Sequence, residues 1–198
     1  MDDRLVRAAE AGDVTEIRRL IATGVDPDAA GAGGTPPLMA AATHRHVEAV
    51  RALLDGGADV DLQDARADNV FLYAGAEGLL DILRLANEAG ADPTITNRYG
   101  GVALIPASER GHVEVVRYLL NETDIDVDHI NKLGWTALLE AILLSDGGPR
   151  HQEIVALLIE NGADVDLADG DGVRPLTHAR RRGQAEIVHL LEAAGANP

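Results

Sequence analysis

The chain has no cysteine, few aromatic residues and no long apolar run. Its aromatic residues are one Trp, three Tyr and one Phe among 198 residues. The lack of cysteine excludes disulfides and thiolate zinc sites. No run approaches the roughly 18 apolar residues of a membrane helix, and no apolar signal region follows Met1. We therefore expect a soluble, cytoplasmic protein that carries no cofactor.

Positive charge is also scarce. The chain has 17 Lys and Arg residues and 33 Asp and Glu residues, which gives a formal net charge of −16. Nucleic-acid affinity depends on clustered Lys and Arg, so we expect neither a nucleic-acid nor a membrane partner, and a monomer. The basic cluster at Arg174, His178 and Arg180–Arg182 is interpreted as a solvated helix end, because cations there complement the helix dipole.

A recurring glycine pattern is the strongest positive signal. Four similar segments begin at glycine: Gly57-Ala-Asp-Val, Gly90-Ala-Asp-Pro, Gly162-Ala-Asp-Val and Gly195-Ala-Asn. Gly57 and Gly90 lie 33 residues apart, as do Gly78 and Gly111. A fixed period of this length indicates stacked supersecondary units that share one long surface.

The residues inside one period predict a pair of helices. Pro37 stands where a first helix begins, a position at which a missing N–H costs nothing. Small residues follow it at helical spacing, and the second helix has a wider apolar stripe of Val and Leu at 47–54. Gly56 and Gly57 then end that helix, since glycine tolerates positive φ.

The segments 33–64, 100–120 and 169–196 resemble ankyrin repeats. The resemblance covers essentially the whole chain and implies an all-α repeat solenoid of stacked helix-turn-helix units with short β-hairpin or loop connections. We predict one domain, 1–198, of about six repeats: an N-terminal cap at 1–30, then 31–63, 64–96, 97–130, 131–168 and a C-terminal cap at 169–198. Segments 98–120 and 134–165 are similar to those of small bacterial ankyrin-only proteins, a resemblance that implies the fold and no particular activity.

Three departures from the repeat carry separate expectations. The segment 145–150, "SDGGPR", is an insertion between two helices, and we predict that the first helix extends past Leu144 and that the loop projects beyond the array. Gly75, inside a helix of the weakest repeat, is interpreted as sequence drift, with Phe71 filling the core. Pro106 should remove one early helical hydrogen bond and shift the helix end.

The polar residues do not form a recognisable catalytic motif. His46, His112 and His151 occupy the turn position where the resemblance implies a structural histidine bonded to backbone. The remaining histidines show no metal-ligand spacing, no GxSxG elbow is present, and 168–173 lacks the ligands of a calcium loop. Glu140 stands among apolar neighbours, where burial would raise its pKa unless a partner reaches it. Arg110 and His178 are the candidate partners, and we predict that the protein is not an enzyme.

The resemblance implies that hairpin tips and first-helix ends bind other proteins in a concave groove. Apolar residues of that surface concentrate in the fourth to sixth repeats, where we predict a ladder of Tyr99, Trp135 and Val173 with Arg98 and Lys132 beside it. The full predicted binding set is Arg98, Tyr99, Glu109, Arg110, Lys132, Leu133, Trp135, Glu140, Leu143, Leu144, Val173 and Arg181. The alternative is a small-molecule or anion pocket, with or without catalysis, framed by Gly100-Gly101, Glu140 and the 145–150 insertion.

Overall fold

The computed structural model describes residues 3–31 and 33–197, and within them the regular structure is entirely α-helical. Twelve helices occur in those ranges, and they follow one another as pairs of short helices. They are α1 (Arg4–Ala11), α2 (Val14–Ala22), α3 (Pro37–Thr43), α4 (Val47–Asp55), α5 (Val70–Glu77), α6 (Leu80–Glu88), α7 (Leu104–Glu109), α8 (Val113–Glu122), α9 (Ala137–Leu143), α10 (Pro149–Glu160), α11 (Pro175–Arg181) and α12 (Ala185–Ala193).

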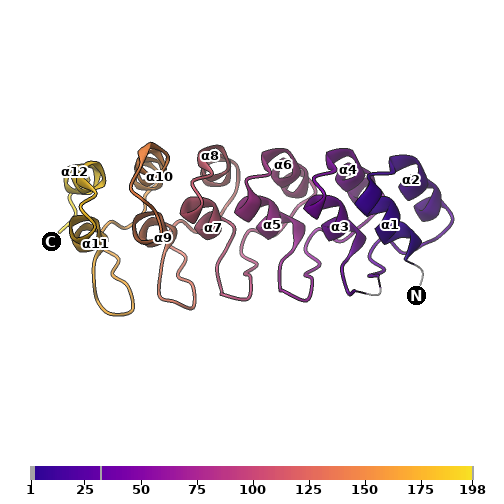
Figure 1. The fold of residues 1–198 in the computed structure, drawn as a ribbon, viewed down its shortest axis with the longest axis horizontal. Coiled ribbons are helices and arrows are strands. Elements are labelled where there is room, and N and C mark those ends of the chain that lie inside the picture. The colour runs from indigo at the N-terminus through magenta and orange to yellow at the C-terminus, as the bar shows by residue number, and fades with distance from the viewer. Residues whose placement is uncertain (1–2, 32, 198) are drawn as a thin grey trace. The chain divides into compact units, whose positions relative to one another are not determined.

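The chain forms two compact units. Unit 1 contains the residues up to Ala74 together with Leu79–Arg98, and unit 2 contains Gly75–Gly78 and the residues from Tyr99 onward. Within each unit, first helices pack on first helices (α1 on α3, α7 on α9, α9 on α11) and second helices on second helices (α2 on α4, α8 on α10, α10 on α12) (Figure 1). Each unit is therefore a stack of helix pairs, as the sequence period predicts.

The predicted helix boundaries follow from proline and glycine. Pro37 and Pro175 are the first residues of α3 and α11, where the ring fits and no hydrogen bond is lost. Gly57, Gly90 and Gly162, which follow second helices, have φ of 89°, 86° and 89°. This left-handed conformation lets the chain leave the helix and enter the long loop before the next pair.

Gly75 has a packing role, so its interpretation as drift is wrong. A Cβ at this position would lie 2.9 Å from the Cβ of Ala103 and 3.2 Å from its carbonyl oxygen, both within unit 2. Only glycine permits this approach of α5 to the turn before α7. In the same repeat, Asn69 Oδ1 accepts from Leu72 N at 2.9 Å as a helix cap, and Phe71 is buried in the core as predicted.

Pro106 is accommodated by a late helix start. Helix α7 begins at Leu104, seven residues after Asn97, whereas α9 begins at Ala137, six residues after the corresponding Asn131. Pro106 is consequently the third residue of α7, and the N–H groups of a first turn have no partner inside the helix. The proline therefore removes no helical hydrogen bond.

The insertion lengthens the second helix rather than the first. Helix α9 ends at Leu143, so the predicted extension past Leu144 is wrong, and α10 begins at Pro149, two residues before His151. The Ser145 hydroxyl donates to the carbonyl of Ala141 at 2.5 Å, a bond that competes with helix continuation. Arg182 also donates to Ser145 O at 2.9 Å, and Gln152 to Gly147 O at 2.8 Å, so the loop is tied back to α10 and to the last repeat.

Candidate functional site

The long loops end in five-residue turns, which we call tips. In the tips 64–68, 131–135 and 169–173 the first N–H donates to the fifth carbonyl, at 2.9, 3.0 and 3.0 Å. The fourth residue of each has positive φ: 59° at Ala67, 77° at Gly134 and 76° at Gly172. Gly100, with φ of 72°, takes the same place in the segment 97–101. The tips therefore present equivalent residues at a fixed position in each repeat.

The first side chain of a tip joins it to the following helix. In the last repeat, Asp169 Oδ1 accepts from the backbone N–H groups of Asp171 and Val173 at 3.0 and 2.8 Å. Its Oδ2 accepts from His178 Nε2 of α11 at 2.7 Å. We call this arrangement, a tip side chain bonded to a helix side chain nine residues later, a latch.

The fifth repeat has the same latch with different chemistry. Asn131 Oδ1 accepts from the N–H groups of Leu133 and Trp135 at 2.9 and 3.1 Å. Its Nδ2 donates to Glu140 Oε1 of α9 at 2.7 Å. Neither latch was predicted. The nine-residue spacing from Asn131 to Glu140 recurs from Asp169 to His178, and an alignment of the two repeats would have shown it.

Glu140 is a buried carboxyl that, among the described residues, is hydrogen-bonded to an amide and not to a cation. Its residue surface is 5% exposed. Burial and, to a lesser extent, the charge of Glu109 raise its pKa from 4.5 to about 7, against the lowering effect of the Asn131 amide. The candidate partners are bonded elsewhere: Arg110 donates to Glu77 and to Ala76 O, and His178 donates to Asp169.

In the last repeat the acid is on the tip and is stabilised as an anion. Burial opposes ionisation of Asp169, but the N–H groups of Val173 and Asp171 and the His178 ring together outweigh it, and its pKa is lowered. The two latches thus place a carboxyl at opposite ends of the same contact, one favouring the neutral form and the other the charged form.

The predicted binding residues fall into three groups by exposure. Tyr99 and Leu133 are 55% and 58% exposed, and Leu144 is 48% exposed. Arg98, Arg110, Lys132 and Arg181 are exposed, Glu109, Trp135, Leu143 and Val173 are half-buried, and Glu140 is buried. The set omits Ile130, which precedes the tip at 131 and is 50% exposed.

The predicted ladder of Tyr99, Trp135 and Val173 has the wrong register. Trp135 and Val173 are both fifth tip residues, whereas Tyr99 precedes the positive-φ Gly100 as Leu133 precedes Gly134. Tyr99 therefore corresponds to Leu133. The third tip residue lies at the apex and the fifth turns back toward the helix, which is why Leu133 is exposed and Trp135 only partly so. Arg98 belongs to unit 1, so it is not placed beside Lys132.

The turn histidines are confirmed as structural. His46 Nε2 contacts the carbonyl of Glu10 at 3.0 Å, His112 that of Ala76 at 3.1 Å and His151 that of Glu109 at 2.9 Å. Each bond satisfies a carbonyl at the end of the preceding first helix. In the last repeat Gln184 takes this role and donates to Ile142 O at 3.0 Å. It was not predicted, because this repeat has Gln where the others have His.

The glycine pair at 100–101 is used in packing between neighbouring tips. Tyr99 O accepts from Lys132 N at 2.9 Å, and Gly100 O contacts His129 Nε2 at 2.7 Å. A Cβ at Gly100 would lie 3.0 Å from Lys132 Cγ. Over residues 3–31 and 33–197, no group of three or more His, Asp or Glu side chains has the arrangement of a metal site. No helix in these ranges has the length and apolar character that crossing a membrane requires.

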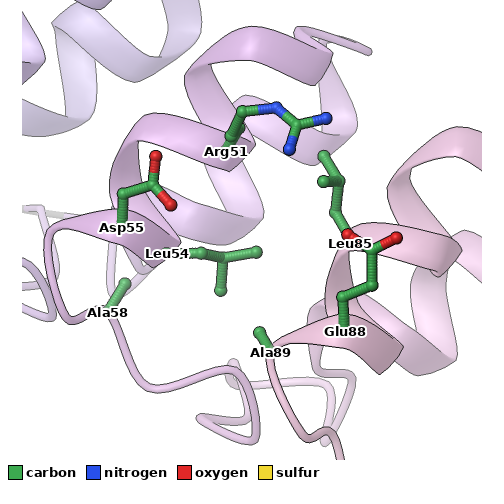
Figure 2. A pocket seen from close by; sticks show the side chains of 7 residues that line it. All are labelled: Arg51, Leu54, Asp55, Ala58, Leu85, Glu88 and Ala89. Carbon is green, nitrogen blue, oxygen red and sulfur yellow. The ribbon is translucent and has the colours of Figure 1, made fainter.

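A cleft of about 370 Å³ lies in unit 1, between α4 and α6 (Figure 2). Leu54 points into the gap from α4, with Leu85 opposite it on α6, and charged side chains surround this apolar floor (Figure 2). None of the predicted site residues lines the cleft, whose lining is Arg51, Leu54, Asp55, Ala58, Leu85, Glu88 and Ala89.

Comparison with known proteins agrees with this architecture. The family model of ankyrin repeats in three copies matches residues 70–169, and that of ankyrin repeats in many copies matches 5–54 and 149–192. A crystal structure of an ankyrin repeat domain from Acinetobacter baumannii is 48% identical, with a TM-score of 0.96 over 98% of this chain and 99% of that one. The ankyrin repeat domain of Bcl-3 is 25% identical, with a TM-score of 0.90 over 99% and 87% of the two chains.

The chain belongs to the ankyrin repeat family. It is also 54% identical to the ankyrin repeat protein YahD of Escherichia coli K12 over 99 residues, which are 50% of this chain and 49% of YahD. The chain thus aligns with about half the length of that curated relative. Ankyrin repeats in general mediate protein–protein interactions and are generally non-catalytic.

Proposed function

We propose that this protein is a non-catalytic module that binds a partner protein through the tips and first-helix faces of the fourth to sixth repeats, 97–198. We further infer that it acts in the cytoplasm as a monomer in one continuous array of the repeats given above. The observation that carries the proposal is the exposure of Tyr99 and Leu133, at 55% and 58%, on tips joined by a backbone hydrogen bond.

The physical support is the combination of apolar area and rigidity. Tyr99 O accepts from Lys132 N at 2.9 Å, while Leu133 N is held by Asn131 Oδ1 at 2.9 Å. Exposed apolar side chains in contiguous positions usually mark contact sites. A tip backbone that is already held in place loses little entropy on binding, so more of the contact energy appears as affinity. Tyrosine is also among the residue types enriched at binding hot spots.

The test is site-specific photo-crosslinking in the native host. A photoreactive residue would replace Tyr99 or Leu133 in turn, and the exposed Glu186 of α12 would carry it as a control. We expect the same protein to be captured at the two tip positions and not at position 186. Equal capture at all three positions, or capture at position 186 alone, would contradict the proposed surface.

A quantitative test follows once the captured protein is purified. The double substitution Tyr99→Ala and Leu133→Ala should weaken its affinity by about 30-fold, roughly 2 kcal/mol, which is typical of hot-spot residues. Ile130→Ala removes a similarly exposed apolar side chain just outside the tip and is the matched control. An equal loss of affinity in this control would contradict a contact centred on Tyr99 and Leu133.

A further inference from the structure

The exposed tip of the fifth repeat is connected to the buried Glu140 by a single side chain. Asn131 Oδ1 accepts from Leu133 N at 2.9 Å, and its Nδ2 donates to Glu140 Oε1 at 2.7 Å. Tyr99 corresponds to Leu133 in the preceding repeat, and its tip is bonded to this one through Lys132 N. Two apolar side chains and one carboxyl group are therefore part of the same hydrogen-bonded segment of unit 2.

Within residues 3–31 and 33–197, Glu140 is bonded to the Asn131 amide and to no cation. Arg110, next to Glu109 in the sequence, donates to Glu77 and Ala76 O. His178 of α11 donates to Asp169, and Arg182 donates to Ser145 O. Glu109, the last residue of α7, adds negative potential at Glu140, and its half-buried position places it nearer the surface. A positive charge supplied from outside would relieve the repulsion between the two.

The sixth repeat shows how this contact is satisfied within the chain. There the helix position is His178 and the tip position Asp169, so donor and acid are both internal and bonded at 2.7 Å. In the fifth repeat the helix position is an acid that receives one amide N–H. In the sixth-repeat latch the acid is therefore paired with a His of the same chain. In the fifth-repeat latch the carboxyl of Glu140 can accept a further donor.

We propose that Tyr99, Leu133 and Glu140, with Glu109, dock a partner segment that carries a Lys or Arg beside an apolar side chain. This inference rests on the proposed function and specifies the chemistry of its partner. The apolar side chain covers Tyr99 and Leu133, and the cation reaches past Glu109 to Glu140. The formal charge of −16 favours approach of such a basic segment, since complementary potentials speed encounter and select partners.

The test uses a displayed library of random dodecapeptides selected on the full chain at pH 8. Parallel selections use Glu140→Gln, which keeps an oxygen acceptor for Asn131, and the control Glu186→Gln, which removes an exposed charge on α12. On the wild-type chain and on Glu186→Gln we expect peptides enriched in Lys or Arg next to apolar residues. On Glu140→Gln we expect the apolar enrichment to remain and the basic enrichment to disappear.

The best wild-type peptide is then synthesised with its basic residue intact or replaced by glutamine. The replacement should weaken binding to the wild-type chain by at least about 10-fold and binding to Glu140→Gln by less than about 2-fold, the pattern of a direct pairwise coupling. Tyr99→Ala with Leu133→Ala should weaken both peptides alike. Melting curves of each variant establish that it is folded.

The outcomes separate the inference from the proposed function. Peptides that need Tyr99 and Leu133 but show no basic preference, or keep it on Glu140→Gln, overturn the inference and leave tip-mediated binding standing. Selection of no peptide that depends on Tyr99 and Leu133 contradicts both.

Discussion

The latches of the fifth and sixth repeats have the same geometry and opposite electrostatics. Asn131 and Asp169 each cap two N–H groups of their own tip and contact the helix residue nine positions later, at 2.7 Å in both cases. In the sixth repeat the pair is Asp with His, and in the fifth it is Asn with Glu. These two repeats thus share a matched donor and acceptor at this contact, whereas the placement of charge differs between them. Four variants test that comparison.

The largest effect is expected from Asn131→Asp, which places a tip acid opposite the helix acid Glu140. The donor to Glu140 Oε1 is lost, because a carboxyl oxygen replaces the Asn131 Nδ2 atom that lies 2.7 Å from it. We expect a loss of about 3 kcal/mol in the free energy of unfolding at pH 8, as for a buried charge without a partner. Urea denaturation at pH 8 and pH 5 measures it, and the loss should shrink at pH 5, where a protonated carboxyl replaces the missing donor.

The companion variant combines Asn131→Asp with Glu140→His and so copies the sixth-repeat latch into the fifth repeat. If the contact requires only a matched pair, most of the lost stability returns at pH 7. Failure of the double variant to recover any stability would show that the surroundings of α9 distinguish the two repeats.

An effect of intermediate size and opposite sign is expected from Glu140→Gln. The pKa of Glu140 is raised from 4.5 to about 7 in the fold, so folding favours its protonated form. Its stabilising contribution is complete below pH 4.5 and is lost as the pH rises through 7. The glutamine should therefore stabilise the protein at pH 8 by on the order of 2 kcal/mol and have little effect at pH 4. Thermal melts across this pH range check the crossover, and destabilisation at pH 8 would contradict it.

The smallest effect is expected from His178→Ala in the sixth repeat. It removes one hydrogen bond to Asp169, which keeps its bonds to the N–H groups of Asp171 and Val173. A loss of about 1 kcal/mol at pH 7 is expected for a bond of this kind. Chemical denaturation measures it, with Glu186→Gln as a control for general surface change. A gain in stability would mean that the helix-side partner is unfavourable in both latches.

Much of the fold could be predicted because it depends on local chemistry. Pro37 and Pro175 begin helices and Gly57, Gly90 and Gly162 end them, since ring constraint and positive φ act within a few residues. The role of the turn histidines was implied by the resemblance to ankyrin repeats, and each of them contacts a backbone carbonyl.

The insertion and Gly75 were predicted wrongly for the same reason. The end of α9 depends on a Ser145 hydroxyl bonded to Ala141 O and on Arg182, 37 residues further along the chain. The need for glycine at 75 depends on Ala103, which approaches it from the turn before α7. Both contacts join residues that are far apart in the sequence, so the local sequence around the insertion or around Gly75 does not predict them.

The candidate site was predictable as a set of surface positions but not in its register or pairing. Tyr99, Leu133 and Leu144 are exposed, in keeping with their assignment to the surface, but Tyr99 aligns with Leu133 and not with Trp135 because tip closure decides which residue lies at the apex. The partner of Glu140 is Asn131, not the cations Arg110 or His178.

The sequence by itself determined the repeat, the helix pairs and the acidic surface, since periodicity, backbone preference and charge are properties of the residues themselves. Only the tertiary structure decided which polar side chains meet. At Glu140 it excludes most water, supplies one amide donor and directs the neighbouring cations to other acids. A carboxyl group's protonation depends on that three-dimensional environment, because desolvation and Coulomb energies vary with distances that the order of residues does not state.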